Sequence, residues 1–285
     1  MRLCRFGDGR LGLVDDSGIR DVTAALDVLA PARYPFPTHD LLIRHLPDVQ
    51  ARIASLPDDG TRQAVATTVL SSPVANPGKL IGAPVNYQAH LDEAIAEPET
   101  FSAAHVRKIQ ETGLFLKATS SLIGVGAPIR VALSERRTDH EVELAVVIGK
   151  EGRNIAIADA LDHVAGYTIG LDITIRGPEE RSLRKSLDSY SVLGPWLVTA
   201  DEYGNPAGRA LSLSVDGELR QSASTSQLIL DVPALIAFAS AFYTLMPGDV
   251  IFTGTPEGVG PIAPGNRIHA AIDGIGALEI DVVSA

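Results

Sequence analysis

Cysteine is nearly absent from the chain, which contains a single one, Cys4. An internal disulfide is therefore impossible, and a metal site built from cysteine thiolates is excluded. No apolar run reaches the roughly 18 residues that a membrane-spanning helix needs, and no basic-then-apolar leader is present. We therefore expect a cytoplasmic protein that does not span a membrane.

Positive charge is also in short supply. Acidic side chains outnumber basic ones by 35 to 24, which gives a net charge of −11. This balance argues against nucleic acid and against an anionic membrane as partners. It does not exclude a small anionic substrate, because a metal ion and a few lysines can reverse the local charge inside a cleft. With 45% apolar residues, the 285-residue chain has enough material for a large core.

The distribution of proline and glycine divides the chain in two. Residues 71–78, which contain serine, proline, asparagine and glycine, are typical of a linker. We therefore predict a small N-terminal domain over residues 1–77 and a catalytic domain over residues 78–285.

Short strands joined by tight turns dominate both parts. Gly7-Asp8-Gly9, Asp216-Gly217 and Asp273-Gly274 each lie between two short apolar segments, which is a hairpin signal. Amphipathic helices are expected over residues 232–245 and, ending at a glycine, over residues 103–112.

The strand predicted over residues 138–149 carries two acids, Glu141 and Glu143, just before it becomes entirely apolar. Because side chains alternate along a strand, both carboxylates point to the same face. Burying two adjacent negative charges is costly unless arginines neutralise them or a cation lies between them. Ligand sets made only of oxygen favour Mg²⁺, Mn²⁺ or Ca²⁺. The competing interpretation is a solvated strand end with two surface glutamates.

Three further features carry potential chemistry. His90 and Glu93 share one face of a predicted helix, where the glutamate can orient the imidazole as a general base; a surface ion pair is the alternative. Asp172 is an isolated acid in an apolar strand, and it either caps a turn or adds a third carboxylate to the same cation. The basic segment over residues 176–185 follows directly and could contact an anionic substrate, or it could be a solvated face.

Six short motifs follow one another along the chain. They are Asn86-Tyr87-x-x-His90-x-x-Glu93, Phe115-Leu116-Lys117, Glu141-x-Glu143-Leu144, Gly170-Leu171-Asp172, Lys185 with Leu193-Gly194-Pro195, and Thr253-Gly254-Thr255-Pro256-x-Gly258-Val259-Gly260. Through these motifs in this order, the region from Lys79 to about Val283 resembles the fumarylacetoacetate hydrolase superfamily, especially its bacterial acylpyruvate-type members.

The resemblance implies an α+β, mainly β fold, a mixed β-sandwich roll preceded by a small N-terminal α/β module. It implies that Mg²⁺ or Mn²⁺ is bound by Glu141, Glu143 and Asp172. It implies that the His90–Glu93 pair lies on a lid and activates water, and that the protein is a homodimer. The residues expected to contact the substrate are Lys117, Lys185, Thr255, Tyr87 and Arg176, of which Lys185 also takes part in catalysis.

The implied activity is hydrolysis of a carbon–carbon bond in an acylpyruvate or a related 2,4-dioxo acid, which yields pyruvate and a carboxylic acid. Metal and lysine would stabilise the enolate that leaves. The alternatives are an oxaloacetate-type decarboxylase, an isomerase of a 2-oxo acid from aromatic catabolism, and a metal- and ligand-binding protein without turnover.

The chain departs from the family pattern at three places. His140 replaces an aromatic residue that many relatives carry before the first glutamate; it either supports the site from behind, which we favour, or is a surface residue. Residues 94–112 form a longer link than in compact members. Residues 177–181 do not continue the Arg-x-x-Gln pattern of pyruvate-forming members, so the acyl group of the substrate is not predicted.

Overall fold

A computed structural model of the chain describes residues 1–96 and 107–285. The architecture is built on an eleven-stranded sheet, whose centre is formed by three antiparallel strands. These are β10 (Val142–Ile148), β11 (Val164–Asp172) and β13 (Ser191–Thr199). They are buried along almost their whole length, as expected of strands that are covered on both faces.

The other strands of this sheet extend it on both sides of the centre. They are β1 (Arg2–Phe6), β2 (Arg10–Asp15), β3 (Gly18–Asp21), β4 (Leu70–Ser71), β5 (Leu80–Gly82), β6 (Phe115–Lys117), β7 (Leu122–Ile123) and β16 (Val250–Phe252). The strand order is β3-β2-β1-β13-β11-β10-β16-β5-β6, with β4 paired to β1 and β7 paired to β13.

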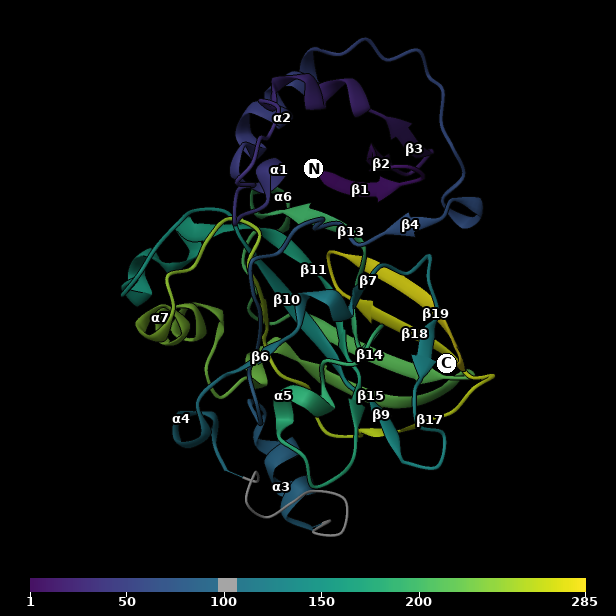
Figure 1. Cartoon of the computed structure of the whole chain (residues 1–285), viewed down its shortest axis with the longest axis vertical. Coiled ribbons are helices and arrows are strands. Elements are labelled where there is room, and N and C mark those ends of the chain that lie inside the picture. The colour runs from purple at the N-terminus through teal and green to yellow at the C-terminus, as the bar shows by residue number, and fades with distance from the viewer. Residues whose placement is uncertain (97–106) are drawn as a thin grey trace.

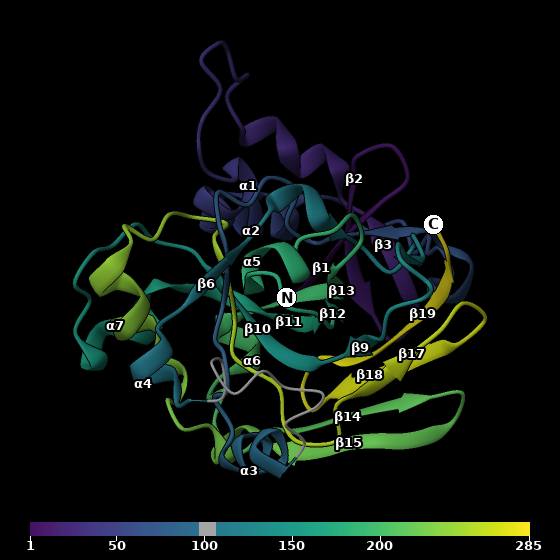
Figure 2. The same ribbon diagram turned by 60° about the horizontal axis from the view of Figure 1, so that its bottom comes forward.

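Two smaller sheets complete the β structure. The five-stranded sheet has the order β15 (Glu218–Ser224), β14 (Ala210–Val215), β18 (Arg267–Ile272), β19 (Gly276–Ser284) and β8 (Ile129–Val131). The three-stranded sheet has the order β12 (Thr174–Ile175), β9 (Thr138–His140) and β17 (Gly260–Ile262). Figure 2 shows the five-stranded sheet lying alongside the central strands.

Alternation along β10 explains how the layers pack. Leu144 and Val146 belong to the apolar cluster that also contains residues of the five-stranded sheet, such as Leu213. Ala145 and Val147 point the other way, into a second cluster that includes residues of the N-terminal segment. The predicted mainly β sandwich is therefore confirmed.

Helices are short and peripheral. They are α1 (Leu41–Arg44), α2 (Leu46–Ser55), α3 (Gln88–Ala96), α4 (Ile109–Thr112), α5 (Arg181–Arg184), α6 (Ala200–Tyr203) and α7 (Val232–Phe242). Turns of 3₁₀ helix cover Thr23–Val28, Val65–Thr67, Thr119–Ser121, Ile157–His163 and Thr225–Gln227. Within the two described ranges, no helix is long and apolar enough to cross a membrane.

The expected local elements are largely confirmed. Asp216 and Gly217 both have positive φ, at 50° and 82°, as a type I′ hairpin turn requires. The helix predicted over residues 232–245 is α7, which ends three residues earlier at Phe242. The helix predicted over residues 103–112 lies partly outside the described residues, and its described end is α4, followed by Gly113 with φ 72°.

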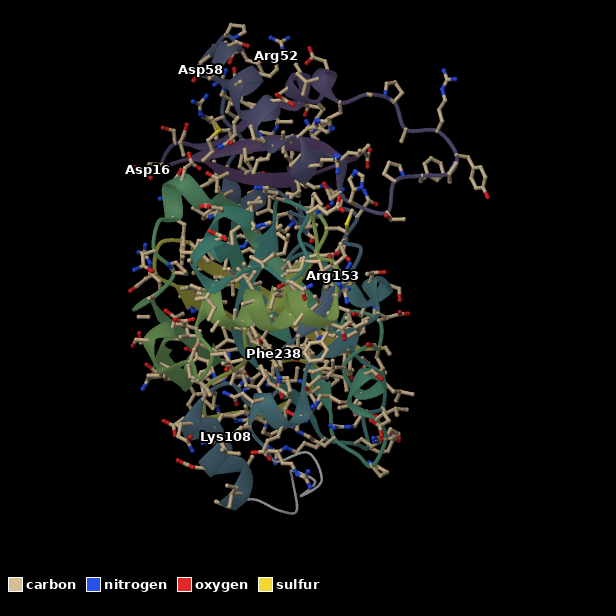
Figure 3. All side chains as sticks on the ribbon, turned by 90° about the vertical axis from the view of Figure 1, so that its left-hand side faces the viewer. Asp16, Arg52, Asp58, Lys108, Arg153 and Phe238 are labelled. Carbon is tan, nitrogen blue, oxygen red and sulfur yellow. The ribbon has the colours of Figure 1, made fainter. Side chains whose placement is uncertain are left out.

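The N-terminal segment packs tightly onto the rest of the chain. Strand β1 pairs with β13 through Arg2 opposite Val198 and Leu3 opposite Leu197, so this segment extends the central sheet. In Figure 1 it forms the purple layer at one end of the molecule, and α3 lies at the opposite end. Figure 3 shows the same separation, with Arg52 and Asp58 far from Lys108. The boundary near residue 77 stays a prediction, but the two parts share a core.

This shared core generates a stability prediction. Removal of residues 1–77 would expose Ala145, Val147 and Val250, which pack against the segment, and exposing apolar surface disfavours the folded state. We expect a protein of residues 78–285 to unfold at a lower temperature than the full chain, or to aggregate. Differential scanning calorimetry of both proteins measures this, and equal unfolding temperatures would contradict the shared core.

Candidate active site

Three carboxylates meet at one end of the central sheet. Glu141 lies between β9 and β10, Glu143 lies in β10, and Asp172 ends β11. One oxygen atom from each carboxylate lies within 4.8 Å of the other two, and the three residues are 5%, 2% and 1% exposed. The alternative of two solvated surface glutamates is therefore wrong.

Two buried lysines reach into this cluster, and both bind Asp172. Lys117, at the end of β6, donates from Nζ to Asp172 Oδ1 and, at 2.7 Å, to the Tyr190 carbonyl. Lys185, next to α5, donates to Glu141 Oε2 at 2.7 Å and to Asp172 Oδ2 at 2.6 Å. Its third hydrogen bond goes to a hydroxyl, that of Thr174, at 2.6 Å. Burial lowers the pKa of Lys117, although the neighbouring Asp172 opposes this shift.

Arg176 supports the cluster from the basic segment. Its Nε donates to Asp139 Oδ2 at 2.6 Å, and its Nη2 lies 3.3 Å from Glu141 Oε1. Burial by itself would raise the pKa of Glu141, but Lys185 and Arg176 outweigh it and lower that pKa. The structure thus places Arg176 against a member of the carboxylate cluster.

Glu143 is the carboxylate whose charge is not compensated. Its Oε2 accepts a 2.6 Å hydrogen bond from the Gly254 amide, and no basic residue of the described chain forms an ion pair with it. Burial, with Asp172 and Glu141 close by, raises the pKa of Glu143 well above its usual value. The Tyr87 hydroxyl is buried without a hydrogen-bond partner in the same ranges, and burial raises the pKa of that phenol, an effect to which Glu143 adds.

These observations fit a divalent cation. Lys117, Lys185 and Arg176 pair with Asp172 and Glu141, whereas no cation of the described residues forms an ion pair with the buried Glu143. An all-oxygen ligand set suits Mg²⁺ or Mn²⁺. Glu141, Glu143 and Asp172 are therefore the residues that would hold the ion.

A glycine-rich loop over residues 253–258 positions two acids at once. The Gly254 amide binds Glu143, and the Gly258 amide donates to Glu93 Oε1 at 2.8 Å. Both glycines have positive φ, at 99° and 87°, which other residues rarely adopt. A Cβ atom on Gly258 would also lie 2.0 Å from the Arg220 carbonyl oxygen.

The predicted contact between His90 and Glu93 is formed. His90 and Glu93 lie on α3, and His90 Nδ1 is 2.9 Å from Glu93 Oε2. The histidine is buried, at 6% exposure, so this is not the surface ion pair that the spacing alone also allowed. Because one carboxylate oxygen binds Gly258 and the other binds His90, the glutamate fixes the imidazole relative to the glycine-rich loop.

The sequence matches the Fumarylacetoacetate (FAA) hydrolase C-terminal family over residues 79–283. The chain belongs to this family. It is 53% identical to the maleylpyruvate hydrolase of Aquipseudomonas alcaligenes over 100% of both chains. It is 41% identical to a mitochondrial oxaloacetate tautomerase of Oryza sativa subsp. japonica, over 72% of this chain and 89% of that protein.

Solved structures of the family agree with the fold. The crystal structure of maleylpyruvate hydrolase from Sphingobium sp. SYK-6 in complex with manganese(II) and pyruvate superposes with a TM-score of 0.85. It is 41% identical, and the match covers 100% of both chains. The predicted membership of the fumarylacetoacetate hydrolase superfamily is confirmed.

The family motifs do not reveal every buried polar group near the site. His140 is fully buried, as expected of a residue that supports the site from behind. Its Nδ1 lies 3.2 Å from Oε1 of Gln221, a residue that the sequence analysis missed. Gln221 also donates to the Thr255 hydroxyl, which itself donates to the Val142 carbonyl. The signal that could have revealed Gln221 is a polar glutamine at an inward-facing position of strand β15.

The charge imbalance at Glu143 predicts the effect of neutralising it. Glu143→Gln removes one anionic ligand, so we expect Mn²⁺ affinity to fall by more than the about 10- to 100-fold typical of losing an outer partner of a metal ligand. Isothermal titration calorimetry with Mn²⁺ measures this. Glu218→Gln, at an exposed strand end, is the matched control. Unchanged affinity in Glu143→Gln would exclude Glu143 as a ligand.

Proposed function

We propose that this protein is a maleylpyruvate hydrolase, which adds water to maleylpyruvate and releases maleate and pyruvate. The full-length match to a maleylpyruvate hydrolase, at 53% identity, carries this proposal. The broader prediction, a metal-dependent hydrolase of a carbon–carbon bond in an acylpyruvate, is confirmed by that relative and by the Sphingobium structure.

The metal centre is proposed to consist of Glu141, Glu143 and Asp172. When bound there, Mn²⁺ or Mg²⁺ supplies Lewis acidity toward the 1-carboxylate and the 2-oxo group of the substrate. The buried position of the three carboxylates excludes bulk water, which strengthens every electrostatic interaction inside the site.

The proposed general base is His90. Because Glu93 Oε2 accepts from Nδ1, the proton of the neutral imidazole lies on Nδ1, and Nε2 is the atom that accepts a proton. His90 Nε2 takes a proton from water, the oxygen of that water forms a bond to the C4 carbonyl carbon, and the C4=O π pair moves onto the carbonyl oxygen. That pair re-forms the carbonyl as the C3–C4 bond breaks, the electron pair of the broken bond leaves on C3 as the pyruvate enolate, and His90 returns its proton to C3, so that pyruvate and maleate are released.

Four side chains are proposed to bind the substrate or the enolate. Lys185 is suited to stabilise the enolate. Its ammonium now donates to Glu141 and Asp172, so it can turn to the substrate only when these two carboxylates bind the metal instead. Lys117 is held by Asp172 in the same way. The buried, unpartnered hydroxyl of Tyr87 supports a substrate hydrogen bond there. The Thr255 hydroxyl is the fourth group.

Arg176 was predicted to bind the substrate directly. Its observed contacts with Asp139 and Glu141 support a different role for Arg176, which is to hold Glu141 in place for the metal. We therefore propose that Arg176 acts on the substrate through that carboxylate.

Oxaloacetate tautomerisation is the second candidate function, favoured by the relative from Oryza sativa at 41% identity. It uses enolate chemistry at the same metal centre, but needs no attacking water. This relative matches only 72% of this chain, whereas the hydrolase matches all of it. The His90–Glu93 pair also favours hydrolysis.

We further propose a cytoplasmic homodimer, as the family resemblance implies. Exposed leucines at positions 116, 133 and 183 line a groove of about 630 Å³, and apolar surface of this kind supports association with a second copy. Analytical ultracentrifugation of Leu183→Glu tests whether this groove takes part in the association with a second copy.

Removing the base tests the hydrolase proposal. We expect His90→Ala to lower kcat for maleylpyruvate by about 10²- to 10⁴-fold, which is the usual contribution of general-base catalysis. Mn²⁺ affinity should stay unchanged, because His90 is not among the proposed ligands. Pyruvate release from maleylpyruvate, fumarylpyruvate, acetylpyruvate and oxaloacetate is measured with Mn²⁺ and with EDTA.

The control variant is His269→Ala, on the exposed face of β18. Pyruvate release from oxaloacetate alone, equal in wild type and His90→Ala, would contradict hydrolysis and support a decarboxylase. Keto–enol conversion of oxaloacetate without pyruvate release from any substrate would instead support a tautomerase.

A further inference from the structure

Gln221 is a fully buried amide whose hydrogen-bonding capacity is completely used. Its Nε2 donates to the Thr255 hydroxyl at 2.8 Å and to the Pro256 carbonyl at 2.9 Å. Its Oε1 accepts from the Val142 amide at 3.0 Å and lies 3.2 Å from Nδ1 of His140. Two donors and two acceptor sites are all that a glutamine side chain offers.

The partners allow only one orientation of this amide. The Val142 N–H can only donate, and the Pro256 carbonyl can only accept, so exchanging the oxygen and nitrogen of Gln221 would break both contacts. A side chain fixed in this way joins two segments at a defined distance. One segment is the start of β10, and the other is the glycine-rich loop over residues 253–258.

Both segments carry parts of the active site. Val142 lies between Glu141 and Glu143 in the sequence. On the other side, the loop binds Glu143 through the Gly254 amide and Glu93 through the Gly258 amide. Gln221 contacts the loop between these two amides, at residues 255 and 256.

Strand β15 presses on the loop at a second point. A Cβ atom on Gly258 would lie only 2.0 Å from the Arg220 carbonyl oxygen, so the strand backbone and the loop are in close contact. The residue next to Gln221 thus limits the position of the amide that holds Glu93. Strand β15 therefore supports the loop at residues 255 and 256 and again at Gly258.

We propose that Gln221 is a positioning residue, which sets the glycine-rich loop against β10 and thereby aligns the metal carboxylate Glu143 with the Glu93–His90 base. This inference rests on the proposed function of the same site. Gln221 touches neither the substrate nor the reacting atoms. It acts through the loop, so its loss affects the metal centre and the base together.

Two variants separate the halves of the amide. Gln221→Met keeps the length of the side chain but removes all four hydrogen bonds. Gln221→Glu keeps oxygen atoms that accept from Val142 and His140, but loses both donors to the loop. Gln50→Met, in α2 of the N-terminal segment, is the matched control for replacing a glutamine by methionine.

We expect Gln221→Met to weaken Mn²⁺ binding by about 10- to 100-fold in calorimetric titration, the usual effect of losing an outer partner of a metal ligand. At saturating Mn²⁺ we expect kcat for maleylpyruvate to fall by about 100-fold, because the base is misplaced, with a smaller change in KM. Gln221→Glu should show the same two losses, since it also releases the loop. Gln50→Met should resemble the wild type in both measurements.

A purely structural glutamine would give a different pattern. Its replacement would lower the unfolding temperature but leave Mn²⁺ affinity and kcat at wild-type values, and this result would overturn the proposal. If Gln221→Met does not fold, Gln221→Glu decides by the same two measurements. If the wild type releases no pyruvate from maleylpyruvate, the proposed function fails, while the Mn²⁺ titrations still test Gln221.

Discussion

Charge balance among buried groups is the constraint on which this structure depends. Three buried carboxylates each place one oxygen atom within 4.8 Å of the others, and Lys117, Lys185 and Arg176 pair with Asp172 and Glu141 but not with Glu143. An unpaired buried charge is costly, so the site is complete only with an additional cation. Burial, together with the nearby carboxylates of Asp172 and Glu141, raises the pKa of Glu143 well above its usual value.

The fold supplies this cluster through the ends of two neighbouring strands. The Asp172 amide donates to the Glu141 carbonyl at 2.9 Å, which places the ends of β10 and β11 side by side. The glycine-rich loop donates a hydrogen bond to Glu143 and another to Glu93, so the metal centre and the general base are parts of one connected unit. The N-terminal segment contributes no described group to this unit, but it covers the opposite end of the sheet.

Much of this was predictable from sequence, because charged residues in apolar strands are informative. The carboxylates at residues 141, 143 and 172 stood out in this way, and the spacing of His90 and Glu93 predicted their contact. Long-range contacts were not predictable. Gln221 approaches the site from a strand about 80 residues away in the sequence, and Arg176 contacts Glu141 instead of pointing toward the substrate. Both contacts depend on how the sheets pack. The shared core of residues 1–77 was hidden for the same reason.

The metal centre is tested most directly by anomalous X-ray diffraction at the manganese edge from crystals grown with Mn²⁺. We expect a single strong anomalous peak between the carboxylates of Glu141, Glu143 and Asp172. We expect this peak to be lost in crystals of Glu143→Gln. A peak at another place in the protein, or its persistence at full height in the variant, would contradict the claim that these carboxylates are completed by a divalent metal.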